Sequence, residues 1–258
     1  MQPQSNKSVD TCDGLIKYRS DLAKFTKAAK IAGEGRDFQP QILSIWPIVT
    51  DWSDNAGFLS YYFWQDLWAA KKIFERKPSS HFDIASRIDG FVAHLLTFMP
   101  VTLIDIRPLP YEIEGLDFVC TDATDMSVIK DDCIESLSSL CAIEHFGLGR
   151  YGDPIDPEAC FKAMSEMERV LSPGGRLYIA VPVGVEGVRF NAHRIFYPRT
   201  IISALSRLSL LDFSVVDTRS SSYMNTQLGI QYMEHADPAD YENEQNDEEL
   251  IGLFEFEK

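Results

Sequence analysis

Residues 81–95 read HFDIASRIDGFVAHL, and this stretch decides the fold that the sequence predicts. Its first part, residues 81–85, is an apolar run of strand length, and residues 91–98 carry the apolar spacing of a helix. A polar loop that contains Gly90 joins the two. A strand, a short loop and a helix in this order form the first half of a βαβ unit, from which parallel sheets are built.

The same alternation of short apolar runs and helices continues along the chain. Helices are expected at 157–170 and 198–208, and further strands at 101–106, 118–121, 134–143, 176–181, 213–217 and 252–256. Strands separated by helices of this length need crossover connections. The pattern therefore predicts an α/β fold with a doubly wound, mostly parallel sheet that has helices on both faces.

The first 78 residues follow a different pattern. Residues 15–25 have helical apolar spacing, and residues 58–74 (FLSYYFWQDLWAAKKIF) are rich in aromatic side chains at helical spacing. We expect residues 1–78 to form an N-terminal helical extension and residues 79–258 to form the α/β domain. The aromatic helix could act as a lid that lines a pocket, or it could pack in the core.

Composition excludes several classes of function. A net charge of -15 would repel the phosphate backbone of nucleic acids. Neither a signal-peptide run nor about 20 consecutive apolar residues is present, so a cytoplasmic protein without a membrane span is expected. The five cysteines form no C-x-x-C pair and the five histidines are scattered, which predicts neither a disulfide framework nor a metal site.

The predicted strand ends place polar residues where parallel sheets bind nucleosides. Ligands of such sheets lie above the carboxyl ends of the strands, with the first loop against the polar part of a nucleotide. Asp105, 22 positions after Asp83, is placed to accept hydrogen bonds from ribose hydroxyls, and Asp122 could face an adenine amino group. The candidate cofactor-binding residues are Asp83, Ala85, Ser86, Arg87, Gly90, Asp105 and Asp122.

The segment after the fourth predicted strand, residues 142–154, is the densest polar cluster in the chain. His145 is the best candidate for a general base that takes a proton from a hydroxyl acceptor, with Glu144 orienting it or acting in its place. A structural hydrogen bond is the alternative role for His145. Candidate acceptor-binding residues are Arg150, Tyr151 and Asp153 here, and Asn191, His193 and Arg194 after the fifth strand.

Several of these segments together resemble class I S-adenosylmethionine-dependent methyltransferases. The resemblance rests on residues 83–90, Asp105, Asp122 and residues 169–177 (RVLSPGGRL), and it covers about residues 80–218. It implies a Rossmann-like sheet of seven strands in the order 3-2-1-4-5-7-6, with the last strand antiparallel. It also implies S-adenosyl-L-methionine as the cofactor.

Within that group, three runs resemble the domain-of-unknown-function family 268. They are residues 81–95, residues 143–156 (IEHFGLGRYGDPID) and residues 191–196 (NAHRIF). The resemblance supplies a family but no reaction. In one departure from methyltransferases, Ala85 and Arg87 stand in the first loop where glycines are usual.

These observations favour a metal-independent O-methyltransferase that acts on a small polar acceptor, such as a sugar or glycan precursor. Arg150 and Arg194 would suit an anionic acceptor. The alternative is a non-catalytic, methyltransferase-like module that binds a ligand or serves as a scaffold, which Ala85 and Arg87 support. A dinucleotide-dependent enzyme is disfavoured because no G-x-G-x-x-G follows the first strand.

Overall fold

The computed structural model describes residues 7–32, 40, 45–49, 60–219, 230–245 and 250–258. The chain divides into two units, Met1–Phe58 and Leu59–Lys258. In the first unit, helix α1 (Lys7–Ala32) contains the helix predicted around residues 15–25. The second unit contains the sheet and is described by itself below.

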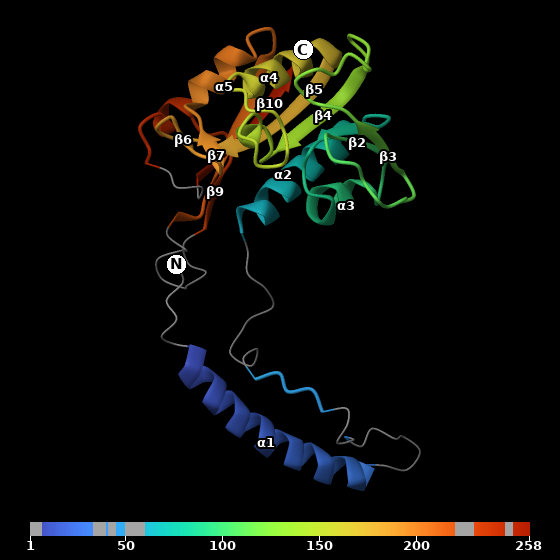
Figure 1. The fold of residues 1–258 in the computed structure, drawn as a ribbon, viewed down its shortest axis with the longest axis vertical. Helices are drawn as coiled ribbons and strands as arrows, with labels where there is room; N and C mark the ends of the chain where they lie inside the picture. The colour runs from blue at the N-terminus through green and yellow to red at the C-terminus, as the bar shows by residue number, and fades with distance from the viewer. Residues whose placement is uncertain (1–6, 33–39, 41–44, 50–59, 220–229, 246–249) are drawn as a thin grey trace. The chain divides into compact units, whose positions relative to one another are not determined.

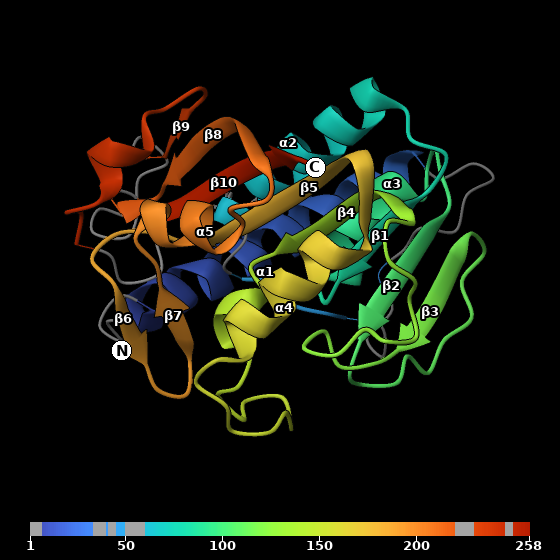
Figure 2. The same ribbon diagram turned by 90° about the horizontal axis from the view of Figure 1, so that it is seen from above.

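The described part of the second unit forms an eight-stranded sheet (Figure 1). Its strands lie in the order β3-β2-β1-β4-β5-β10-β8-β9, as Figure 2 shows from above. The bounds are β1 (His81–Ile84), β2 (Val101–Asp105), β3 (Leu116–Cys120), β4 (Ile134–Leu140), β5 (Leu171–Pro182), β8 (Ser209–Asp217), β9 (Gln231–Met233) and β10 (Leu250–Glu257).

Strands β1 to β5 pair in parallel, whereas β10 is antiparallel to both β5 and β8. With β8 as the sixth strand and β10 as the seventh, the order is the predicted 3-2-1-4-5-7-6. The predicted fold class is therefore confirmed. The strand count of seven is corrected to eight, because β9 pairs antiparallel with the outer edge of β8.

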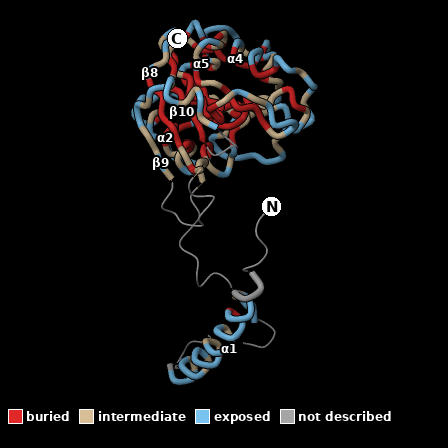
Figure 3. Tube along the Cα trace, turned by 90° about the vertical axis from the view of Figure 1, so that its left-hand side faces the viewer, coloured by how far each residue is buried: buried red, intermediate tan, exposed pale blue. Residues whose placement is uncertain are grey.

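Helices cover both faces of the sheet, as Figure 2 shows. Helices α4 (Ala159–Val170) and α5 (Pro198–Ala204) pack in one apolar cluster, and α2 (Tyr61–Arg76) and α3 (Ala93–Leu95) pack in the other. Buried residues concentrate between these layers (Figure 3). The central strand β4 is buried at six of its seven positions, as expected for a strand covered on both faces.

Helix α2 belongs with the α/β unit, although the sequence placed residues 1–78 in a separate extension. The physical reason is its buried stripe of Trp68, Ala69 and Ile73, which packs against Phe91 and other residues of the second cluster. The helix ends where Lys77 adopts a left-handed conformation with a φ of 55°.

The remaining elements are short. A π-helical turn η3 (Ile88–Val92) leads into α3, so the helix expected at 91–98 begins three residues earlier. The 3-10 helix η4 (Ile143–His145) occupies the end of the strand expected at 134–143. Also present are the 3-10 helix η6 (Pro238–Tyr241) and an antiparallel hairpin of β6 (Gly187–Arg189) and β7 (His193–Ile195).

Candidate functional site

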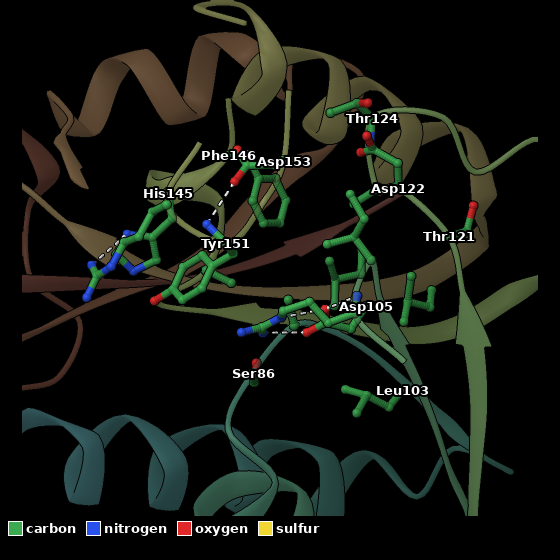
Figure 4. Close-up of a pocket in the computed structure, with 18 of the residues that line it drawn as sticks. Ser86, Leu103, Asp105, Thr121, Asp122, Thr124, His145, Phe146, Tyr151 and Asp153 are labelled. Carbon is green, nitrogen blue, oxygen red and sulfur yellow. Dashed lines mark hydrogen bonds and ion pairs between the residues drawn. The ribbon is translucent and has the colours of Figure 1, made fainter. Parts of the chain in front are cut away.

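A cavity of about 810 Å³ lies above the carboxyl ends of β1 to β4. Its volume lies within the range of small-molecule sites, roughly 300 to 1,000 Å³. The wall includes these predicted site residues: Ala85, Ser86, Arg87, Asp105, Asp122, His145, Arg150, Tyr151 and Asp153. Figure 4 shows Tyr151 between His145 on one side and Asp105 on the other. The structure therefore brings predicted cofactor-binding residues and predicted acceptor-side residues together around one cavity.

Asp83 lies beneath this cavity, not on its wall. Its buried carboxylate accepts hydrogen bonds from the backbone N–H of Ser86 (2.9 Å), the hydroxyl of Ser86 (2.8 Å) and the hydroxyl of Ser138. The Ser86 hydroxyl oxygen in turn accepts the N–H of Leu140 at 3.0 Å. Burial raises the pKa of Asp83 to about 6, against the opposing effect of the hydrogen bonds from Ser138 and Ser86. In this structure Asp83 fixes the first loop to β4.

At Ala85 the first loop takes a backbone conformation that glycine favours. Ala85 has a φ of 59°, in the left-handed region that glycine favours, and its N–H donates to Ile104 O at 2.9 Å. Arg87 turns outward at the rim, where it pairs with Asp89 through Nη2 and Oδ2 at 2.7 Å and lies 5.5 Å from the Tyr62 ring centre. The loop therefore leaves the cavity open.

Gly90 lies away from the cavity wall, at the contact between η3 and α2. A Cβ atom at this position would clash with the carboxylate of Asp66. The glycine predicted to contact the cofactor thus allows close packing of a helix instead.

Asp105, at the end of β2, is engaged by a residue that the sequence did not single out. Arg107 donates from Nε to Oδ1 (3.0 Å), from Nη2 to Oδ2 (2.7 Å) and from its backbone N–H to Oδ1 (2.7 Å). A carboxylate has about four lone-pair sites, so about one site remains for a ligand hydroxyl. The signal in the sequence was an arginine two residues after a strand-end aspartate, within reach of that aspartate.

Asp122 follows β3 and lies on the same side of the cavity as Asp105, across from His145 (Figure 4). Its Oδ1 accepts the N–H of Thr124 at 2.8 Å, which leaves further acceptor sites on the carboxylate. Asp122 thus lines the cavity, and its role toward the base of a nucleoside stays a prediction.

His145 ends the turn η4 and lines the cavity. Its Nδ1 lies 2.6 Å from Ala192 O; because a carbonyl can only accept, we assign the proton to Nδ1 and a lone pair to Nε2. Nε2 lies 3.7 Å from Oε1 of Glu144, whose side chain is buried and lies off the cavity wall. Burial lowers the pKa of His145 to about 4, so the ring is neutral at pH 7.

The loop at 146–154 is held together by Asp153. Its carboxylate accepts backbone N–H groups of Gly147 (2.7 Å), Gly149 (3.2 Å) and Tyr151 (3.1 Å). Burial raises the pKa of Asp153, but these hydrogen bonds outweigh burial and leave the pKa below its usual value. The resulting turn presents Arg150 and Tyr151 on the cavity wall.

The second predicted polar group, residues 191–194, lies on the hairpin of β6 and β7. It contacts the loop at 146–154 outside the cavity wall. Arg194 is buried and donates to the carbonyl of Phe146 at 2.6 Å, and His193 is also buried. Neither of these side chains nor that of Asn191 is on the cavity wall. The backbone carbonyl of Ala192 is the group that reaches His145.

The described residues contain neither a metal-binding cluster nor a helix that could span a membrane. No group of three or more histidine, cysteine, aspartate or glutamate side chains is arranged to hold a metal ion. No helix in this part of the chain is long and apolar enough to cross a bilayer.

Comparison with known proteins agrees with the resemblance seen in the sequence. The model of a family described as "Caenorhabditis protein of unknown function, DUF268" matches residues 120–243. This match covers two of the three runs on which that resemblance rests. No curated protein matches the chain.

Solved structures share the fold at low sequence identity. The (4+2)-cyclase SpnF is 17% identical with a TM-score of 0.54, over 80% of this chain and 85% of that chain. A 1,6-didemethyltoxoflavin N1-methyltransferase from Burkholderia thailandensis, with bound S-adenosylhomocysteine, is 14% identical with a TM-score of 0.52, over 100% and 93% of the two chains. The N-methyltransferase NodS from Bradyrhizobium japonicum, also with S-adenosylhomocysteine, is 14% identical with a TM-score of 0.50, over 77% and 86%.

Proposed function

Starting from a methyltransferase-like chain whose residues 120–243 match the DUF268 family, we propose that this protein is an S-adenosyl-L-methionine-dependent methyltransferase. The observation that carries the proposal is the open cavity of about 810 Å³ at the ends of β1 to β4, with acidic residues after β2 and β3. This is where open parallel sheets bind nucleosides.

The residues on the cavity wall fit the cofactor. Asp105 retains about one acceptor site for a ribose hydroxyl, and Asp122 can accept from an adenine amino group. The apolar side chains of Leu103 and Phe118 lie on the same part of the wall. When bound, S-adenosyl-L-methionine supplies an electrophilic methyl group on a sulfonium.

On the acceptor side, His145 is proposed to hold the proton that a hydroxyl acceptor loses as its oxygen takes up a methyl group. The lone pair on Nε2 can receive that proton, and the Nδ1 bond to Ala192 O fixes the ring. A base with a low pKa is sufficient here, because a hydroxyl oxygen that gains a carbon substituent becomes strongly acidic. Glu144 acts as a positioning residue at 3.7 Å from His145 Nε2.

The proposed reaction is metal-independent O-methylation of a small polar acceptor, such as a sugar or a glycan precursor. Arg150, Tyr151 and the loop held by Asp153 would position this acceptor, since they share a wall with His145. We propose that Arg194 supports this loop directly, through its bond to Phe146 O, and that Asn191 and His193 support it through the hairpin of β6 and β7.

The first experiment is calorimetric titration with S-adenosylhomocysteine. We expect micromolar binding, which Asp105→Ala weakens by about tenfold to a hundredfold, the effect of losing a hydrogen bond to a charged group. Asp117→Ala is a matched control, because this exposed aspartate of β3 lies off the cavity wall. His145→Ala should leave binding unchanged and lower turnover. Wild-type affinity in Asp105→Ala would contradict the site assignment.

One observation favours a second candidate, a non-catalytic binding module. Arg107 fills about three of the four acceptor sites of Asp105, and a fold does not by itself fix a function. Arg107→Gln separates the two candidates. If the Asp105 carboxylate binds the ribose hydroxyls, the variant should bind S-adenosylhomocysteine at least as tightly as the wild type. Absence of binding in both proteins would favour the module.

A further inference from the structure

The charges on the cavity wall are mostly neutralised in pairs. Three carboxylates each pair with a nearby cation: Asp89 with Arg87, Asp105 with Arg107, and Asp156 with Lys162. The carboxylates of Asp122 and Asp153 accept backbone N–H groups. Arg150 differs, because no carboxylate of the described residues lies within ion-pair distance of its guanidinium. It is therefore the wall cation most available to a ligand.

The position of Arg150 is defined by two contacts. Its Nη1 donates to Ala192 O at 2.9 Å, and its guanidinium carbon lies 5.2 Å from the centre of the Tyr151 ring. The guanidinium of Arg107 lies 4.6 Å from the same ring centre. Both guanidinium groups thus lie near one aromatic ring on the wall, and of the two only that of Arg107 is paired with a carboxylate, Asp105.

We propose that Arg150, with Tyr151 and Arg107 beside it, binds an oxyanion of the acceptor, either a carboxylate or a phosphate. The inference rests on the proposed function, because it names the class of acceptor for that site. A guanidinium presents five N–H donors in a planar fork that matches both oxyanions, and the hydrogen bond to Ala192 accounts for one of them.

This anion site lies next to the proposed base. Arg150 Nη1 is 3.5 Å from His145 Nδ1, and the charge of Arg150 lowers the pKa of His145, second to burial among the effects that lower it. His193 acts in the same direction, Asp153 opposes it, and Glu144 lies 3.7 Å from Nε2. An anion that neutralises Arg150 would therefore raise the pKa of His145 and strengthen the base when the acceptor binds.

The test follows the arginine side chain directly by nuclear magnetic resonance. The Nε–Hε signal of Arg150, identified as the one missing from Arg150→Gln, is monitored in the full chain during titration with inorganic phosphate or sodium acetate. Chloride keeps the ionic strength constant. We expect a saturable shift of this signal with at least one of the two anions, and the stronger of the two identifies the oxyanion. The pKa of His145 should rise in the saturated protein.

Variants separate this site from general attraction of anions. Arg150→Gln should weaken the affinity for the anion by about tenfold, the loss of one charge-assisted contact. Arg199→Gln is the control, because Arg199 also lies on a tyrosine, 3.9 Å from the Tyr197 ring centre, but lies off the cavity wall. Unlike Arg150, Arg199 pairs with a carboxylate, that of Glu242. Arg199→Gln should change the affinity by less than about twofold.

An unchanged anion affinity in Arg150→Gln, or an Arg150 signal that moves with neither anion, would overturn the inference. Circular dichroism of Arg150→Gln checks that the variant is folded. If that variant does not fold, Arg150→Lys, which also lacks the Nε–Hε group, identifies the wild-type signal, and the titration of that signal decides alone. The proposed function is tested separately, because it fails if S-adenosylhomocysteine does not bind. Anion binding without nucleoside binding would therefore support the anion site and contradict the methyltransferase proposal.

Discussion

Replacing Asp83 by asparagine removes a buried carboxyl whose titration should make the stability of the fold depend on pH. Asp83 is fully buried, and its pKa is about 6 in the fold compared with 3.8 ordinarily, because burial outweighs the hydrogen bonds that favour the charged form. The folded state therefore keeps its proton while the unfolded state loses it. Between about pH 4 and pH 6, this difference corresponds to about 3 kcal/mol of unfolding free energy.

The sign of this effect is opposite to that of a salt-bridged aspartate. The contribution of the carboxyl is complete below pH 3.8 and is lost as the pH rises through about 6. Asparagine does not titrate, and its altered hydrogen bonds contribute equally at every pH. The free-energy difference, wild type minus Asp83→Asn, should therefore fall by about 3 kcal/mol between pH 3.5 and pH 7.

Urea denaturation, followed by tryptophan fluorescence at several pH values, measures this difference. Asp66 is a second buried carboxyl whose pKa burial raises to about 6, but it titrates in both proteins and cancels to a first approximation. A difference that stays constant within about 0.5 kcal/mol over this range would refute the argument. A rise with pH would show that the hydrogen bonds from Ser86 and Ser138 dominate over burial.

Two further substitutions test the elements that position the site. Ser138→Ala should lower the free energy of unfolding by about 1–3 kcal/mol, as measured by chemical denaturation. The Ser138 hydroxyl bonds both the buried Asp83 carboxylate and His81 Nε2, so its removal leaves each of them without this partner. Gly147→Ala should cost at least about 2 kcal/mol in the same assay, because its φ is 76° and a Cβ would clash with a backbone carbonyl. Gly152→Ala, with a φ of 86° and open space around it, should cost only about 1 kcal/mol, and equal losses would contradict the steric argument.

Local patterns predicted the strands and the doubly wound, mostly parallel class of the sheet, whereas the strand order came from the resemblance to class I methyltransferases. Each apolar run marked a strand, and right-handed crossovers leave few arrangements for strands joined by helices. The strand β9 was not predicted because Gln231–Met233 has only three residues and lies at the sheet edge. Three residues are too few to show the alternation of apolar and polar side chains that marks a strand. Core packing was one of the two roles predicted for the helix at 58–74, and α2 does pack in the second cluster, although the boundary at residue 78 set it apart from the α/β domain.

The candidate site was predictable to the level of strand ends, but not to the level of side-chain direction. Asp105 and Asp122 reach the cavity wall as expected. Asp83 pairs in register with Ser138 of the neighbouring strand, and its carboxylate binds Ser138 instead of pointing toward a ligand. Because side chains alternate between the two faces of a strand, a shift of one residue in a predicted strand end reverses the direction of its side chain.

Arg107 could not be assigned from the sequence for a related reason. The side chains of residues two apart in a loop can meet or diverge, and only the backbone conformation after β2 brings its guanidinium onto Asp105. Arg194 shows the opposite outcome: it was predicted to face a ligand, but the hairpin turns it onto the carbonyl of Phe146. Arg194 is fixed by a contact with a distant segment, whereas Arg107 is fixed by the backbone conformation of its own loop.

A net charge of -15 and an anion site in the same chain are compatible, because the two act over different distances. Charges on the surface are screened over about 8 to 10 Å in physiological salt, so they oppose a long polyanion more than one small group. Inside the cavity, Arg150 would contact the oxyanion directly, while the carboxylates of Asp105 and Asp156 are already paired with cations. The attraction between Arg150 and the oxyanion is strong because the two groups are in contact. The negative surface lowers the rate at which small anions reach the cavity. Higher salt should therefore speed the association of phosphate more than it weakens the bound state.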